Sequence, residues 1–188
     1  SEKDDLASAV LGVKTFDLEP LARQPLPGIH QRTRAFLKVQ DGCDNLCTYC
    51  VTRLARGAGR SVSVEQVLDD ARFAVAGGAR ELVLTGVHLG SWGREMNPPA
   101  RLQDLIVTLL ARGGMQRLRL SSLEPWEIDP ELIELWRDPR LCRHLHLPLQ
   151  SGSQSVLRRM LRKTELPEFA RLIQQFRAAA PGMAITTD

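Results

Sequence analysis

The chain has 188 residues, of which 43% are hydrophobic and 25% are charged. This composition is that of an average globular domain, and it excludes collagen-like, coiled-coil and disordered chains. The most apolar stretches, 81–89 and 102–110, are half as long as a membrane-spanning helix. The first residues do not show the pattern of an export signal, in which a charged segment is followed by an apolar one. We therefore expect a cytoplasmic protein of one domain without a membrane partner.

The formal net charge is +3, and the basic residues are 21 Arg against 4 Lys. Arg grips phosphate with a planar fork, although an Arg-rich composition also follows from a GC-rich genome. Residues 1–29 carry more acidic than basic side chains, so the positive charge belongs to residues 30–188. That part is the better candidate for binding a polyanion.

Residues 17–31 contain three prolines and a glycine without apolar periodicity, which is typical of a linker. We assign 1–31 to a linker from an upstream domain and 32–188 to the folded domain. A strand-like run at 183–187 breaks off at the last residue, so this domain is expected to be truncated at its C-terminal end.

Short apolar runs alternate with longer amphipathic ones along the folded domain. The predicted strands are 35–40, 81–85, 117–120, 144–149 and 183–187, and the predicted helices are 64–76, 102–111, 130–136, 153–161 and 166–180. Ser63 and Gln66 form a capping-box pattern, and Asp129 before Pro130 is a second helix start. Strict strand-helix alternation predicts a parallel sheet, whose chemistry lies on the loops that follow the strands.

Three of the four cysteines share the loop after the first predicted strand. Cys43, Cys47 and Cys50 have the spacing C-x3-C-x2-C, which indicates a metal or redox centre rather than a disulfide framework. Structural zinc requires four ligands, whereas a 4Fe-4S cluster held by three thiolates keeps one iron open. Cys142 precedes a strand at the opposite rim, and we interpret it as a packing residue.

This cysteine loop, with an aromatic residue before its last cysteine, resembles that of the radical S-adenosylmethionine (SAM) enzymes. Within that group the methylthiotransferases are the branch with matching motifs, which here are 47–50, 55–57, 84–93, 119–125 and 144–153. The resemblance covers residues 32–188. It implies an α/β fold, a partial parallel (β/α) TIM-like barrel, truncated after about five strands.

The resemblance also implies a set of site residues. Cys43, Cys47 and Cys50 would hold the 4Fe-4S cluster, whose open iron is chelated by SAM before SAM is cleaved to a 5'-deoxyadenosyl radical. The residues implied to approach SAM are Tyr49 near the adenine, Gly86 near the amino group, Ser122 and Glu124 near the methionine or ribose, and Gln150 and Ser151 at the mouth.

The loop 85–93 is most similar to the branch that acts on N6-threonylcarbamoyladenosine 37 in the anticodon loop of tRNA. The alternatives are the branches acting on isopentenyladenosine 37 or on a ribosomal-protein aspartate, and a zinc-stabilised RNA-binding module without chemistry. The resemblance further implies an electron donor such as flavodoxin or ferredoxin and a second 4Fe-4S cluster held by an upstream domain. With one cysteine left over, the isolated chain is expected not to methylthiolate tRNA.

Several residues admit a structural as well as a functional interpretation. Glu124 before Pro125 could be only a turn acid, and His144 and His146 could form a metal pair or belong to a polar strand face. The basic run of Arg158, Arg159, Arg162 and Lys163 could contact RNA or be the solvated face of a helix. Trp92 and Trp126 could stack on a base or pack in the core.

Overall fold

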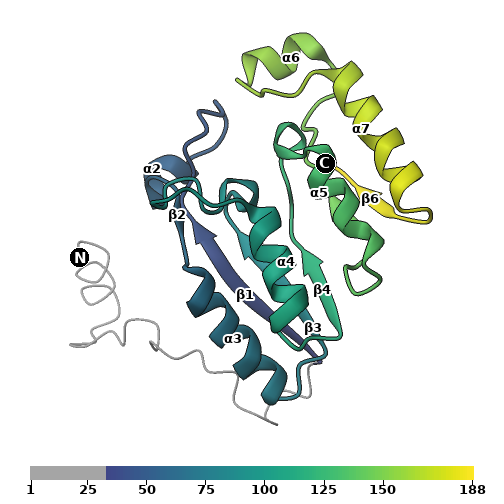
Figure 1. Cartoon of the computed structure of the whole chain (residues 1–188). Coiled ribbons are helices and arrows are strands. Elements are labelled where there is room, and N and C mark those ends of the chain that lie inside the picture. The colour runs from purple at the N-terminus through teal and green to yellow at the C-terminus, as the bar shows by residue number, and fades with distance from the viewer. Residues whose placement is uncertain (1–32) are drawn as a thin grey trace, which may run out of the picture.

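The computed structural model of the protein describes residues 33–188, so the predicted linker 1–31 lies outside the described residues. These residues form a half-barrel in which helices cover the outer side of a curved set of strands (Figure 1). The predicted α/β half-barrel is thereby confirmed.

The main sheet has the strand order β2-β1-β3-β4, and β5 and β6 form a second, two-stranded sheet. The strands are β1 Arg34–Asp41, β2 Arg60–Ser61, β3 Glu81–Gly86, β4 Arg117–Leu120, β5 His144–His146 and β6 Ala184–Thr186. Strands β1, β3 and β4 pair in parallel, as do β5 and β6. Two isolated parallel bridges, Leu118–Leu141 and Ser122–His146, connect β4 to the β5 segment.

The expectation of strict parallel alternation was wrong at one place. The short β2 pairs antiparallel with the end of β1, with Gln40 opposite Ser61 and Asp41 opposite Arg60. This return lets the chain after the cysteine loop run back beside β1 before the first long helix begins. Two residues are too few to show alternation, so the sequence carried no strand signal there.

The helices follow the predicted order, with one additional turn after the cysteine loop. They are α2 Thr52–Arg56, α3 Val64–Ala76, α4 Leu102–Arg112, α5 Pro130–Glu134, α6 Gln154–Arg159 and α7 Leu166–Ala179, and the 3-10 turns are η1 Leu89–Ser91, η2 Pro125–Glu127 and η3 Leu135–Arg137. No helix among residues 33–188 is long and apolar enough to cross a membrane.

The caps explain where the helices begin. The Ser63 hydroxyl accepts a hydrogen bond from the Gln66 backbone N–H at 3.3 Å, but the Gln66 side chain donates to Asp70, so the capping box is only half formed. The Asp129 carboxylate accepts from the Leu132 N–H at 2.8 Å, as predicted. Helix α6 is shorter than predicted, and shortly beyond its end Leu161 has a φ of +54°, which is incompatible with a right-handed helix.

The core lies between the sheet and the helices, and leucines of β3, β4 and α4 contribute to it. Trp136 and Phe176 meet edge to face with ring centroids 5.2 Å apart, which joins η3 to α7. Trp92 is fully buried and donates its indole N–H to the Val62 carbonyl at 3.0 Å. Trp92 is therefore a core residue, and its ring is not accessible for stacking on a nucleic-acid base.

Candidate functional site

The cysteine loop leaves the carboxyl end of β1 through a tight turn at Gly42. Gly42 has a φ of +74°, a conformation that favours glycine, and the Gln40 side-chain amide donates to its carbonyl at 2.9 Å. The Cys43 N–H then donates to the Gly57 carbonyl at 3.1 Å. The first cysteine is thus held by backbone bonds at the end of the sheet.

The rest of the loop lies against the end of α6 at the same rim (Figure 1). The Thr48 N–H donates to the Met160 carbonyl at 3.1 Å, and the Cys50 N–H closes a turn on the Cys47 carbonyl at 3.1 Å. The thiols of Cys43 and Cys47 are half-buried, and that of Cys50 is exposed. Three thiols therefore line one accessible loop.

The charges around Cys43 show how the thiols are grouped. Burial raises the pKa of the Cys43 thiol, a hydrogen bond from the Asn45 backbone opposes that rise, and the charges of Cys47 and Cys50 add to it, so both of these thiols lie within electrostatic reach of Cys43. No three His, Cys, Asp or Glu side chains of residues 33–188 already converge on one metal position. The donor set of three soft thiols still fits an iron-sulfur cluster, provided that the loop draws them together.

Arg162 and Glu124 form an ion pair beside this loop. Arg162 Nη2 lies 2.7 Å from Glu124 Oε2, and Nη1 donates to Oε1 at 3.0 Å. The Arg162 side chain is only 2% exposed; it also donates to the Pro148 carbonyl and lies 4.5 Å above the Trp126 ring. The solvated-face interpretation is therefore wrong for Arg162, because the helix ends before this residue and the chain turns inward.

Tyr49 lies next to this ion pair and is half-exposed. Partial burial raises the pKa of its hydroxyl to about 12, although the Arg162 charge acts in the opposite direction. The charges of Cys47 and Glu124 also raise the pKa of the Tyr49 hydroxyl. The ring, the second cysteine and the ion pair are therefore neighbours. The sequence predicted Tyr49 and Glu124 for the site but missed their buried partner, which it had grouped with exposed arginines.

The other predicted SAM-contacting residues also lie at the carboxyl ends of strands. A Cβ at Gly86 would lie 3.0 Å from the Gln40 Cβ, so a side chain at this position would be tightly packed. Ser122 is bridged to β5, the Gln150 amide donates to Asp188 at 3.0 Å, and the Ser151 hydroxyl accepts from the Ser153 N–H at 3.1 Å. Their placement at one rim agrees with the prediction, and their contacts with SAM stay predictions.

A buried polar network supports the loop from below, and the sequence did not single it out. His88 Nε2 lies 3.3 Å from the Asn45 side-chain nitrogen and 2.9 Å from Glu127 Oε1. Arg94 Nη2 is also 2.9 Å from that carboxylate oxygen, whose side chain is 1% exposed. His88 stood in the motif that carried the family resemblance, but nothing in the pattern paired it with Glu127.

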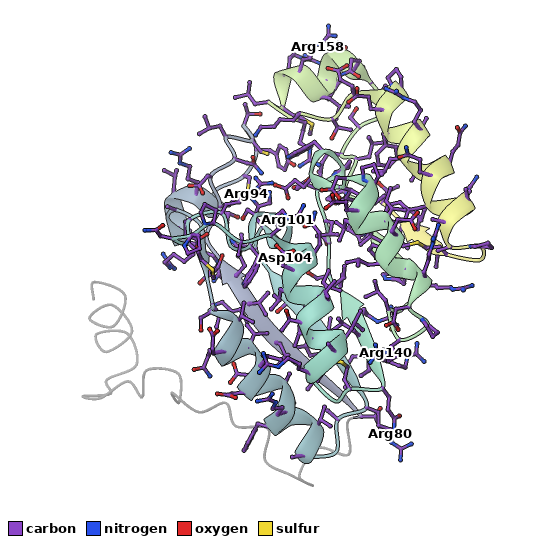
Figure 2. The ribbon with its side chains drawn as sticks, viewed as in Figure 1. Arg80, Arg94, Arg101, Asp104, Arg140 and Arg158 are labelled. Carbon is purple, nitrogen blue, oxygen red and sulfur yellow. The ribbon has the colours of Figure 1, made fainter. Side chains whose placement is uncertain are left out.

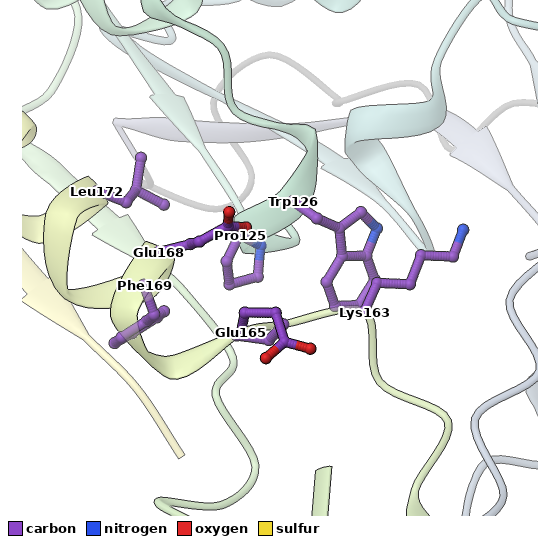
Figure 3. A pocket seen from close by; sticks show the side chains of 8 residues that line it. Pro125, Trp126, Lys163, Glu165, Glu168, Phe169 and Leu172 are labelled. Carbon is purple, nitrogen blue, oxygen red and sulfur yellow. The ribbon is translucent and has the colours of Figure 1, made fainter. Parts of the chain in front are cut away.

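A small pocket lies beside Trp126, between η2 and the start of α7 (Figure 3). Its walls include Trp126, Lys163, Glu165 and Phe169.

The basic residues around α6 differ in exposure from Arg162. Lys163 is exposed, as are Arg158 and Arg159, so these three basic side chains remain available to a polyanion. Figure 2 shows Arg158 projecting from α6.

The remaining candidates lie apart from the cysteine loop. Cys142 is 6% exposed, and its thiol is 3.8 Å from Glu81 Oε2, at the end of the sheet where β3 begins. It is a packing residue at the opposite rim, as predicted. His146 Nδ1 is 3.0 Å from the Thr186 hydroxyl, and burial lowers the pKa of His144, with Arg119 and His146 nearby.

Comparison with known proteins agrees with this geometry. The family model of the Radical SAM superfamily matches residues 37–187. The solved structure of the cobalamin-dependent S-adenosylmethionine radical enzyme OxsB, at 17% identity, superposes on 81% of this chain and 23% of its own with a TM-score of 0.65, which supports the fold.

Curated relatives are more similar in sequence. The threonylcarbamoyladenosine tRNA methylthiotransferase of Thermotoga maritima is 40% identical over 90% of the chain, the tRNA-2-methylthio-N(6)-dimethylallyladenosine synthase of Lawsonia intracellularis 37% over 82%, and the ribosomal protein uS12 methylthiotransferase of Desulforudis audaxviator 38% over 97%. The chain spans 39%, 35% and 42% of their lengths. On the family match over residues 37–187, this chain belongs to the radical SAM superfamily.

Proposed function

We propose that this chain is the radical-forming part of a methylthiotransferase, with Cys43, Cys47 and Cys50 as the protein ligands of a 4Fe-4S cluster. The observation that carries the proposal is the grouping of three thiols on one accessible loop at the carboxyl ends of the strands. A closed zinc site would need a fourth ligand, and Cys142 is buried at the other end of the sheet. Three thiolates leave one iron for SAM.

The residues around the loop would orient SAM. When bound, the cluster supplies the electron that cleaves SAM to a 5'-deoxyadenosyl radical. Tyr49 offers a half-exposed aromatic face for the adenine, and Glu124 offers a carboxylate whose direction is fixed by Arg162. Gly86, Ser122, Gln150 and Ser151 would line the same mouth. An electron donor such as flavodoxin or ferredoxin would reach the cluster from the exposed side of Cys50.

The proposed substrate is N6-threonylcarbamoyladenosine 37 of tRNA. The relatives named for three different substrates are nearly equally identical to this chain, so overall identity does not separate them. The loop 85–93 favours the threonylcarbamoyl branch. Exposed Arg158, Arg159 and Lys163 beside the site would contact phosphates.

The complete reaction also needs a sulfur donor. A second 4Fe-4S cluster would serve this role, and its ligands must come from outside these residues, because Cys142 is the one cysteine that remains. We therefore expect this chain alone to form the radical without transferring a methylthio group. Mass spectrometry of nucleosides from incubated tRNA would contradict this division if it found a methylthio-adenosine derivative.

The test of the radical step is anaerobic reconstitution with iron and sulfide, followed by SAM and dithionite. We expect 5'-deoxyadenosine from the parent chain and from the Cys142→Ala control, and none from Cys43→Ala. The substrate assignment is tested by adding anticodon stem-loops. A stem-loop carrying threonylcarbamoyladenosine should increase SAM cleavage more than one carrying isopentenyladenosine or a peptide of uS12, and the reverse order would favour another branch.

A further inference from the structure

We infer that His88 is a positioning residue of the cysteine loop, which it fastens through Asn45 to the buried carboxylate of Glu127. Asn45 stands between Cys43 and Cys47, so the point of attachment lies inside the proposed ligand loop. The inference rests on the proposed function only for what the loop binds. The attachment itself is a property of the folded chain.

The burial of the two inner members makes the attachment strong. His88 is 6% exposed and the Glu127 side chain is 1% exposed, so neither group exchanges its partner for water. His88 Nε2 lies 2.9 Å from Glu127 Oε1, a close electrostatic contact that is not aligned as a hydrogen bond, since neither carboxylate oxygen of Glu127 has a hydrogen-bond partner among the described residues. Arg94 reaches the same oxygen from solvent and brings the compensating positive charge.

The directed hydrogen bond of His88 is the one to the loop. Nε2 and the Asn45 side-chain nitrogen lie 3.3 Å apart with hydrogen-bond geometry. Glu127 lies 2.9 Å from the same ring nitrogen without a hydrogen bond, so the carboxylate acts on the imidazole through its charge. One ring nitrogen thus contacts both the loop and the buried carboxylate.

Two further contacts keep His88 in place. The His88 backbone N–H donates to Gln40 Oε1 at 2.7 Å, and the Gln40 amide nitrogen donates to the Gly42 carbonyl at 2.9 Å. Gly90 allows η1 to approach η2, because a Cβ there would overlap the Glu127 carboxylate. Gln40 therefore holds the beginning of the loop and His88 holds its middle. Gln40 lies at the end of β1, and His88 follows the end of β3.

The role of His88 is tested on the metal-free chain by hydrogen exchange of the loop amides, measured by mass spectrometry. We expect His88→Ala to increase exchange in residues 43–48 by about tenfold, because the loop can then open locally. His88→Gln should restore protection, since its side-chain amide can form a hydrogen bond with Asn45 from a similar place. His144→Ala, a half-buried histidine at the start of β5, is the matched control and should leave the loop unchanged.

A double change separates the proposed contact from general loosening. If the imidazole acts through Asn45, then Asn45→Ala should increase exchange to a similar extent, and the pair Asn45→Ala with His88→Ala should add little more. Additive effects, unchanged exchange in His88→Ala, or an equal effect of His144→Ala would each overturn the inference. These outcomes do not depend on whether the loop binds iron.

A second measurement examines the consequence for the loaded chain. After reconstitution, His88→Ala should keep its iron but give an altered electron paramagnetic resonance spectrum of the reduced cluster, and His88→Gln should return the spectrum toward that of the parent. A parent-like spectrum in His88→Ala would show that the attachment through His88 has no influence on the thiols, and would contradict a positioning role for this residue. Failure of the parent to bind iron would instead contradict the proposed function and leave the exchange result standing.

Discussion

The two ends of the parallel sheet contain the same kinds of residue, yet they differ in what those residues can do. The carboxyl end has three cysteines, two buried or half-buried glutamates and a buried arginine, and the amino end has one cysteine, a glutamate and three arginines. Residue type alone would mark both ends as candidate sites. Burial and partners distinguish them.

At the amino end the charged groups are already matched. Glu81 Oε1 lies 2.8 Å from Arg34 Nε and 2.8 Å from Arg119 Nε, and Oε2 lies 3.3 Å from Arg117 Nε. Cys142 is buried against the same carboxylate. This arrangement joins β1, β3 and β4 and leaves no thiol accessible.

At the carboxyl end the ion pairs fix the surroundings and leave the thiols free to react. Arg162 and His88 are both buried, and each lies against a glutamate carboxylate, while Cys50 is exposed. The difference between the two ends shows what distinguishes a functional site: reactive side chains that stay accessible, surrounded by side chains that are fixed by burial and ion pairs. The following experiments break or sharpen this contrast.

The largest expected effect is on iron binding. The triple change of Cys43, Cys47 and Cys50 to Ala should remove all bound iron, because no thiolate remains on the loop. Iron analysis after anaerobic reconstitution is the measurement, and circular dichroism should show an intact fold. Cys142→Ala is the control and should bind as much iron as the parent; loss of iron in that variant would reverse the roles of the two ends.

Removing Arg162 should cost the most stability. Arg162→Ala leaves Glu124 without its partner at a largely buried place, and we expect the free energy of unfolding to fall by about 3 kcal/mol. Urea denaturation measures this change, with Arg158→Ala as the exposed control, expected within about 0.5 kcal/mol of the parent. A change in Arg162→Ala as small as in the control would show that the pair is solvated.

The ion-pair cluster at the amino end should affect stability without affecting iron. Glu81→Gln should lower the free energy of unfolding by about 2 kcal/mol, because three arginines lose their common partner. Iron content should equal that of the parent. Reduced iron binding would indicate that the two ends are coupled.

The pH dependence of the same variant gives an independent check. Burial alone would raise the pKa of Glu81, but the hydrogen bond from Arg119 and the charges of Arg34 and Arg117 outweigh burial and hold it below its usual value. A carboxyl with a lowered pKa stabilises the fold above its unfolded value of about 4.3 and loses that contribution as pH falls through the folded value. The parent should therefore lose more stability than Glu81→Gln when pH is lowered below about 4.

The smallest effect is expected at a helix cap outside both ends. Ser63→Ala removes the hydroxyl that accepts from the Gln66 N–H at the start of α3, and should cost about 1 kcal/mol. Iron content and loop exchange should be those of the parent. A change in either would mean that destabilisation anywhere reaches the loop, which would weaken every comparison above.

The regular elements were predictable because their signals are local. Helix α3 has the predicted bounds, and β4 and the start of α4 also agree, since apolar periodicity and terminal glycines determine them. Strand β2 was not predictable, because it depends on where the chain after the loop meets β1. Strand β5 ends at His146 although the sequence of residues 147–149 resembles that of a strand, and only the Leu147 N–H of this segment donates to the backbone of β6, at the Thr186 carbonyl.

The site was predictable in its ligands and not in its supports. Three cysteines on one loop are visible in the sequence. Arg162 belongs to the same basic run as exposed residues, and the sequence does not show that α6 ends before Arg162 and that its side chain is buried. The pairing of His88 with Glu127 spans separate loops, and no spacing encodes it. Tertiary contacts between loops are set by the packing of the sheet and therefore require the structure.

The central claim is that the three cysteines of the carboxyl end hold one cluster with an iron open to SAM. Its most direct test is electron paramagnetic resonance of the anaerobically reconstituted and reduced chain, before and after SAM is added, together with metal analysis. We predict about four iron atoms per chain and a spectrum that changes on adding SAM. A colourless chain that retains zinc instead, or a cluster whose spectrum ignores SAM, would contradict the account.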